Sequence, residues 1–191
     1  MGPATLFGQD LPPGLSYRHD FITQAEEARL LAAIRTITFA TFAMRGVAAK
    51  RRVAFFGESY DRGDAQPLPE FLLPLREQIA EWVRVAANEF AMALINEYPA
   101  GAPIGWHRDA PQYDIVAGVS LLSACRMRFR PYVSPAAAKD AKRMVRRTAT
   151  HEIRLARRSA YLMTGESRTG YEHHIPPVSE PRYSITFRTL R

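Results

Sequence analysis

Apolar residues recur at two different spacings along the chain, and the spacing changes after Phe90. In the first part, a capping-box sequence at Thr23 is followed by apolar residues at helical spacing, which predicts a helix over 24–35. Pro74 opens a second helix, whose apolar residues lie along one side as far as Phe90. Loops are expected over 1–16 and 58–70.

After Phe90 the apolar residues alternate with polar ones, as is typical of strands that bury one face. The expected strands are 92–98, 115–123, 125–130, 151–156, 159–163 and 182–188. One of them alternates apolar residues with Arg126, Arg128 and Arg130, so one of its faces carries three guanidinium groups. Segment 134–148 is either a helix or a mobile insertion. The pattern predicts one domain with helices packed on a β-sandwich or barrel.

The composition is that of an ordinary globular domain. With 191 residues, 47% of them hydrophobic and 24% charged, the chain can bury a full core, which excludes a disordered or collagen-like protein. Cys125 is the single cysteine, so no internal disulfide forms and a reducing compartment is indicated. No secretory signal or membrane-spanning stretch is evident. We therefore expect a cytoplasmic protein with no membrane partner. We also expect a monomer.

Positive charge is concentrated in one third of the sequence. The chain has 26 basic and 19 acidic residues, and the segment from Arg126 to Arg158 alone holds 11 basic residues against two acidic ones. Such a concentration is expected of a protein that binds a polyanion, and arginine suits phosphates because its planar fork binds two oxygens at once. A solvated surface face explains the same charge equally well. Charge thus makes nucleic acid a candidate partner without deciding the question.

Candidate metal chemistry begins at His107, which has an acid two residues later, Asp109. At the end of a strand, such a pair can project to the same side and provide two ligands for one metal ion. Two histidines and one carboxylate bind non-haem iron(II) with three positions left open, and His173 or His174 could supply the third ligand. Taken alone, His-x-Asp is more often a surface histidine beside a solvated aspartate.

A candidate anion site lies near the C-terminus. Arg182 and Arg188 fall on the same face of the last expected strand, with their Cα atoms about 20 Å apart. Two long side chains that fold toward each other across that span could bind both ends of a short dicarboxylate. In isolation, a surface strand with a polar outer face is the simpler interpretation.

Taken in order, several segments resemble the AlkB family. They are the Asn-x-Tyr…Gly…His-x-Asp pattern over 96–109, the strand over 119–121, the Ser-Arg…His-x-Ile pattern over 167–175, and the Arg-x-(Asn/Ser)-x-Thr-Phe-Arg pattern over 182–188. A fainter likeness over 51–57 matches the arginine-rich, Phe/Tyr-Gly stretch that precedes the family's substrate lid. Four motifs in family order and at family spacing make the resemblance specific, although each one alone is weak.

This resemblance implies an α+β, mainly β fold: a double-stranded β-helix (jelly-roll) core over about 91–191, with N-terminal helices and a substrate lid over about 1–90 packed on it, in a single domain 1–191. It also implies iron(II) as cofactor, with 2-oxoglutarate and O2 as cosubstrates. The implied metal ligands are His107, Asp109 and His173, because the His-x-Ile register selects His173 over His174. The implied 2-oxoglutarate residues are Arg182 with Tyr98 at the distal carboxylate, and Arg188 with Asn96 at the metal-chelating one.

The activity implied by the resemblance is oxidative demethylation of alkylated DNA or RNA bases, with release of formaldehyde and succinate. The candidate substrate-binding residues are Arg51, Arg52, Tyr60, Arg128 and Arg168, with Arg45, Arg126 and Arg130 as further candidates. Phe55 and Phe56 are more typical of a core than of a stacking cage. Pro111 stands where some family members have an acid, and Tyr171 where several have tryptophan. The resemblance therefore does not identify the methylated base that the protein acts on. The same chemistry on a protein or small molecule, and a binding protein with vestigial metal residues, are the alternatives.

Overall fold

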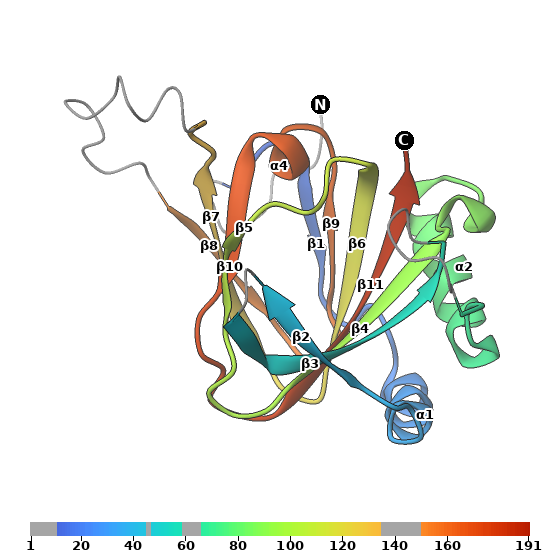
Figure 1. The fold of residues 1–191 in the computed structure, drawn as a ribbon. Coiled ribbons are helices and arrows are strands. Elements are labelled where there is room, and N and C mark those ends of the chain that lie inside the picture. Colours follow the sequence, from blue (N-terminus) through green and yellow to red (C-terminus); the bar gives the residue numbers. More distant parts are fainter. Residues whose placement is uncertain (1–10, 45–46, 59–65, 135–149) are drawn as a thin grey trace.

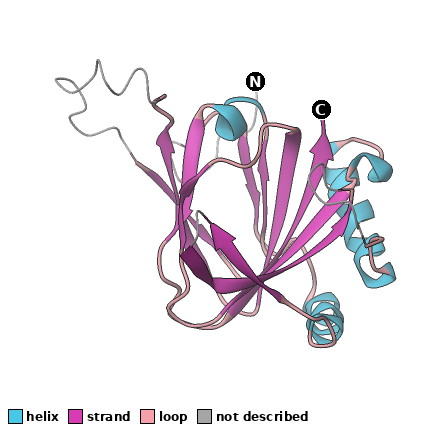
Figure 2. Ribbon diagram, in the orientation of Figure 1, coloured by secondary structure: helices cyan, strands magenta, loops and turns pink. Residues whose placement is uncertain are grey.

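Two β-sheets face each other in the structure, and the long helices lie outside one of them (Figures 1 and 2). A computed structural model describes residues 11–44, 47–58, 66–134 and 150–191. The larger sheet has the strand order β1-β9-β6-β11-β4-β3-β2, and the smaller sheet has the order β5-β10-β7-β8. Neighbouring strands in both sheets run antiparallel. This arrangement is the two-layer sandwich expected from the period-two pattern.

The larger sheet is built from β1 (Leu15–Arg18), β2 (Ala40–Met44), β3 (Val47–Gly57), β4 (Met92–Tyr98), β6 (Tyr113–Leu121), β9 (Ala160–Met163) and β11 (Arg182–Leu190). The smaller sheet is built from β5 (Ile104–His107), β7 (Cys125–Pro131), β8 (His151–Leu155) and β10 (Tyr171–Ile175). The helices are α1 (Gln24–Ile34), α2 (Leu73–Val83) and the short α4 (Gly165–Thr169), with 3-10 turns at Glu70–Leu72 and Ala87–Glu89.

Most predicted elements are present, with two kinds of difference. The capping box at Thr23 opens α1 as expected. The second helix ends at Val83, earlier than predicted, because Arg84 adopts a left-handed conformation with φ 65° that stops the helix. Part of the expected N-terminal loop forms strand β1, and β2, β3, β5 and β10 were not predicted. These strands lack a long alternating pattern of apolar and polar residues, so periodicity alone did not indicate them.

Apolar side chains fill two layers, one on each side of the larger sheet. Under α1 and α2, Ile34 and Ile79 pack on the outer face of the sheet, where Phe187 is fully buried. Between the sheets, Met127 and Phe129 from the smaller sheet are buried. A large apolar side chain buried in this way contributes about 1.5–3 kcal/mol. The described residues contain no helix long and apolar enough to span a membrane.

A buried carboxylate ties α1 to the sandwich. The Glu27 side chain is 1% exposed and accepts hydrogen bonds from the Leu122 backbone N–H at 2.9 Å and from Arg157 Nε at 2.7 Å. Leu122 has a positive φ of 73°, as does Arg158 at 65°, so both connections turn sharply beside this carboxylate. Since a buried charge is stable only when it is paired and hydrogen-bonded, Glu27 fixes the helix and two turns together.

Candidate active site

A cavity of about 550 Å³ lies between the two sheets. The sheet registers explain which side chains reach it. In the larger sheet, β4 and β11 pair Tyr98 with Arg182 and Asn96 with Ser184, and directly opposed residues project from the same face. All four of these side chains line the cavity. The alternation read from the sequence therefore places the predicted 2-oxoglutarate residues on the inner face of the sheet.

The three predicted metal residues meet on the other side of this cavity. His107 ends β5, and its Cα partner in the antiparallel register is His173 of β10, so both imidazoles project inward. Their ring centroids are 4.2 Å apart. Asp109 lies two residues after the end of β5, and its Oδ2 lies 3.7 Å from His173 Nε2. Two short strands thus bring together residues that are 64 to 66 positions apart in the chain.

The protonation states of these groups suit a divalent cation. Burial lowers the pKa of His107, and burial together with the neighbouring His107 lowers the pKa of His173 to about 3, so both rings are neutral. Burial opposes ionisation of Asp109, yet Arg188 and the two histidines hold the pKa of Asp109 far below its usual range. His107 Nδ1 lies 2.9 Å from the Gly105 carbonyl oxygen, an arrangement that leaves Nε2 as the acceptor atom. The set is two neutral imidazoles and one carboxylate.

Among the described residues, only one of the two Asp109 carboxylate oxygens accepts hydrogen bonds. Oδ1 accepts hydrogen bonds from Arg188 Nη2 at 2.8 Å and Nε at 3.2 Å. Oδ2 is buried and has no hydrogen-bond partner among the described residues. Within that part of the chain no three His, Cys, Asp or Glu side chains stand in a ready-made metal-ligand arrangement. The fit to iron(II) therefore rests on the donor chemistry and on the unpartnered oxygen.

His174 points away from this cluster. Its Nδ1 lies 2.6 Å from the Ile104 carbonyl oxygen, and its ring stacks on Trp106 with centroids 4.9 Å apart. Successive residues of a strand face opposite sides of the sheet, so the inward position of His173 places His174 on the outer face.

Arg182 is a fully buried cation with incomplete hydrogen bonding. The residue is 1% exposed, its Nη2 donates to Ser120 Oγ at 2.8 Å, and its Cζ lies 4.8 Å from the centre of the Tyr98 ring. Its Nε and Nη1 have no hydrogen-bond partner among the described residues. Because buried donors without acceptors are costly, this guanidinium fits an anionic ligand with carboxylate geometry.

Several cavity residues were not predicted from the sequence. Tyr161 of β9 lies opposite Gly118 of the neighbouring strand β6 and hydrogen-bonds to Thr186. A Cβ atom on Gly118 would lie 2.4 Å from the Tyr161 ring, so the glycine makes room for the aromatic side chain. Ser120 and Tyr161 lie in strands that the sequence predicts. Only the sheet register shows that their side chains project from the inner face of the larger sheet.

The candidate substrate residues separate into two groups. Arg51 lines the cavity, is 7% exposed and donates from Nη1 to Asn96 Oδ1 at 2.9 Å; burial lowers its pKa. Phe55 also lines the cavity, whereas Phe56 belongs to the core under the helices. Arg52 instead forms a short ion pair with Glu97 and has a side chain 51% exposed.

The remaining candidates lie away from the cavity. Arg128 projects from the outer face of the smaller sheet and pairs with Glu152 at 2.6 Å. Arg168 is buried and donates from Nη2 to the backbone carbonyls of Ala110 and, at 3.0 Å, Tyr113. It thus braces the loop that follows Asp109. Tyr60, Arg45 and most of segment 134–148 lie outside the described residues.

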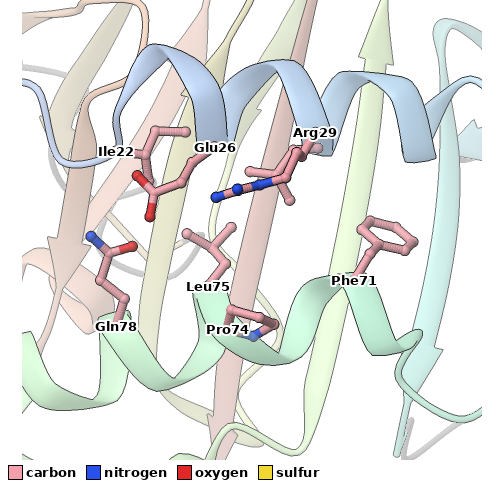
Figure 3. Close-up of a pocket in the computed structure, with 8 residues that line it drawn as sticks. Ile22, Glu26, Arg29, Phe71, Pro74, Leu75 and Gln78 are labelled. Carbon is pink, nitrogen blue, oxygen red and sulfur yellow. The ribbon is translucent and has the colours of Figure 1, made fainter.

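A second pocket, of about 250 Å³, lies between α1 and α2 (Figure 3). Ile22, Leu30, Phe71, Pro74 and Leu75 give it an apolar lining, to which Glu26, Arg29 and Gln78 add polar groups. The larger sheet separates this pocket from the histidine cluster. It therefore takes no part in the site described above.

Comparisons with known proteins agree with this geometry. The family model of the 2OG-Fe(II) oxygenase superfamily matches residues 14–188. The chain is 31% identical over 193 residues to an "Alkylated DNA repair protein ALKBH8 homolog" of Arabidopsis thaliana, covering 91% of this chain and 54% of that protein, so it spans about half of that relative. It is also 24% identical to an uncharacterized protein of Acanthamoeba polyphaga mimivirus, covering 93% of this chain and 85% of that protein.

Two solved structures share the fold. "The structure of OsALKBH1" matches with a TM-score of 0.70 at 15% identity, covering 95% of this chain and 99% of that one. A Pseudomonas putida prolyl-4-hydroxylase matches with a TM-score of 0.59 at 13% identity, covering 93% of both chains. The predicted jelly-roll fold and the predicted AlkB resemblance are confirmed. The chain belongs to the 2OG-Fe(II) oxygenase superfamily and is an iron(II)- and 2-oxoglutarate-dependent dioxygenase.

Proposed function

We propose that the protein oxidatively demethylates alkylated bases in DNA or RNA. One observation carries the underlying chemistry: the cavity that holds two neutral histidines also holds an Asp109 oxygen and two Arg182 nitrogens that are buried without hydrogen-bond partners among the described residues. A metal site and a carboxylate site at opposite walls of one cavity suit a 2-oxo acid that chelates iron. The likeness to the Arabidopsis thaliana protein supports alkylated nucleic acid as the substrate class.

In this proposal His107, Asp109 and His173 bind iron(II), and Arg182 binds the distal carboxylate of 2-oxoglutarate beside the Tyr98 ring. Bound iron(II) and 2-oxoglutarate supply the oxidising chemistry with O2, and the protein positions the reactants. Arg188 holds Asp109 in one orientation through two hydrogen bonds. Asn96 lies on the same wall and accepts a hydrogen bond from Arg51.

The cavity charge supports an anionic cosubstrate. Arg51, Arg182 and Arg188 line it, and Asp109 is the only carboxylate among the described residues that line it. A cavity of about 550 Å³ also lies within the usual size range of ligand pockets. The excess positive charge stabilises a dianion.

A second candidate is the same oxidation on a protein or small molecule. It is favoured by the position of the β7 arginines: Arg126, Arg128 and Arg130 project from the outer face of the smaller sheet, away from the cavity. These side chains therefore do not guide a flipped base into the mouth of the cavity.

Formaldehyde release tests the proposal. The protein is incubated with iron(II), 2-oxoglutarate and ascorbate, together with single- and double-stranded DNA and RNA oligonucleotides that each carry one N-methylated base. We expect formaldehyde and succinate in equal amounts from at least one oligonucleotide, and none from the Asp109→Ala variant. If succinate forms but none of the oligonucleotides releases formaldehyde, the nucleic-acid substrate is rejected in favour of a protein or small-molecule substrate.

A further inference from the structure

Two arginines oppose each other on the outer side of the smaller sheet. The antiparallel register of β7 and β8 pairs Arg126 directly with Arg154. The flanking Cys125 and Met127 are buried between the sheets, so both arginines project outward. Like charges directly opposite each other in a sheet repel and are destabilising. An anion held between them would remove this cost.

A pocket of about 300 Å³ lies beside this pair. Arg126 and Arg154 form one part of its lining, and residues 176–179, between β10 and β11, form another. Ser179 is among these residues and brings a hydroxyl group. The two arginine side chains therefore lie at the edge of a concave surface.

Neighbouring carboxylates do not neutralise the pair. Glu152 lies 2.6 Å from Arg128 Nε but 3.8 Å from Arg126 Nη1, so its charge is committed mainly to Arg128. Glu172 is taken by Arg130 at 2.7 Å. No carboxylate of the described residues forms an ion pair with Arg154. The outer face of this sheet thus keeps an excess of positive charge at its Arg126–Arg154 end.

We propose that Arg126 and Arg154 form a phosphate-binding site that holds the backbone of a single-stranded nucleic acid, separate from the cavity between the sheets. Guanidinium groups bind phosphate oxygens in pairs, and two of them around one pocket can share a single phosphate. Outward residues along β7 are about 6.8 Å apart, and the next two, Arg128 and Arg130, are each paired with a carboxylate, so the uncompensated charge stays at the Arg126–Arg154 end. The site goes beyond the proposed demethylation and does not depend on the chemistry in the cavity.

The test is binding of a fluorescein-labelled 12-nucleotide oligodeoxythymidylate by the full chain at several salt concentrations. In Arg154→Glu we expect affinity to fall at least about tenfold, and the slope of log K against log salt to become shallower by about 0.7 for each phosphate that the protein no longer neutralises. Arg35→Glu, on the exposed end of α1, carries the same change in charge and serves as the control, with an expected change below about threefold. Arg154→Glu replaces a repulsive cross-strand pair by an attractive one, so its melting temperature should not fall.

Equal losses of affinity in Arg154→Glu and Arg35→Glu would overturn the site, because they would show only an effect of net charge. If the unaltered protein does not bind the oligonucleotide, the assignment to nucleic acid is wrong. Inorganic pyrophosphate is then tested, and binding to the unaltered protein but not to Arg154→Glu would show that the site takes a free phosphate ligand. Formaldehyde release separates this inference from the proposed function. If oligonucleotide binding requires Arg154 but no oligonucleotide is demethylated, the phosphate site is supported and the proposed function is rejected. If oligonucleotides are demethylated and Arg154→Glu binds them as well as the unaltered protein, the proposed function is supported and the phosphate site is rejected.

Discussion

At the scale of single residues, the Arg182 guanidinium is the most informative group in the cavity. It is fully buried, yet two of its three nitrogens lack a partner among the described residues. Folding keeps a charged group in this state only at a cost, which is typical of residues that serve binding at the expense of stability. The cost is offset when an anion occupies the cavity.

Replacing Arg182 by glutamine should therefore weaken 2-oxoglutarate binding much more than it alters folding. Removal of a charge-assisted, two-point interaction of about 3 kcal/mol corresponds to a rise of about 100-fold in KM for 2-oxoglutarate. Thermal unfolding should change little, because the variant also removes an incompletely paired charge. An unchanged KM, measured by succinate formation, would show that the distal carboxylate binds elsewhere.

At the scale of elements, the sequence predicts strands better than it predicts which way they face. β11 follows from clear alternation over residues 182–188 and β4 from a run of apolar residues, and these two strands bring Asn96 and Arg182 to one wall. β5 and β10 have only four and five residues and no alternating pattern, although they carry the two inward histidines. The pairing of His107 with His173 is a tertiary register, which a local pattern does not encode.

Two adjacent arginines also show that the sequence does not predict which face of a strand meets the cavity. Arg51 and Arg52 are neighbours in β3, and nothing in the sequence distinguishes them as ligand-binding candidates. The register with β4 turns Arg51 into the cavity and Arg52 toward Glu97 on the other face. Likewise, the predicted alternation of β7 is correct, but which face of the strand meets the cavity depends on the position of the whole sheet.

The packing of β6 against β9 provides a test at this scale. A methyl group at Gly118 would meet the Tyr161 ring at 2.4 Å, so Gly118→Ala must displace the ring and its hydrogen bond with Thr186. We expect a loss of about 1–3 kcal/mol in unfolding free energy and weaker 2-oxoglutarate binding. Gly105→Ala in β5 is the matched control, because no atom lies within 4 Å of its added Cβ. Equal stability of the two variants, measured by chemical denaturation, would contradict the close approach of Gly118 to the ring.

At the scale of the whole molecule, the helices stabilise the sandwich from outside while the reactive groups lie inside it. Glu27 joins these parts, because it is buried and binds the Leu122 N–H and the Arg157 side chain. Its removal should loosen α1 without reaching the cavity on the far side of the larger sheet.

Glu27→Gln should accordingly lower the unfolding free energy by about 2 kcal/mol, since the variant removes a charge-assisted bond to a half-exposed arginine. The exposed Glu77 of α2 offers a control, whose change to glutamine should cost less than about 0.5 kcal/mol. Urea unfolding measures both variants, and KM for 2-oxoglutarate should stay constant in each. A Glu27→Gln protein as stable as the unaltered protein would show that the helix layer is held by apolar packing alone.

The binding of iron(II) and 2-oxoglutarate in one cavity is most directly tested by their visible charge-transfer absorption without oxygen. The adjacent histidines give a matched pair of variants, because His173 faces Asp109 at 3.7 Å whereas His174 stacks on Trp106 outside the cluster. We predict that the band forms in the unaltered protein and in His174→Ala, and is absent in His173→Ala. A band that survives in His173→Ala, or disappears only in His174→Ala, would contradict the metal site described here.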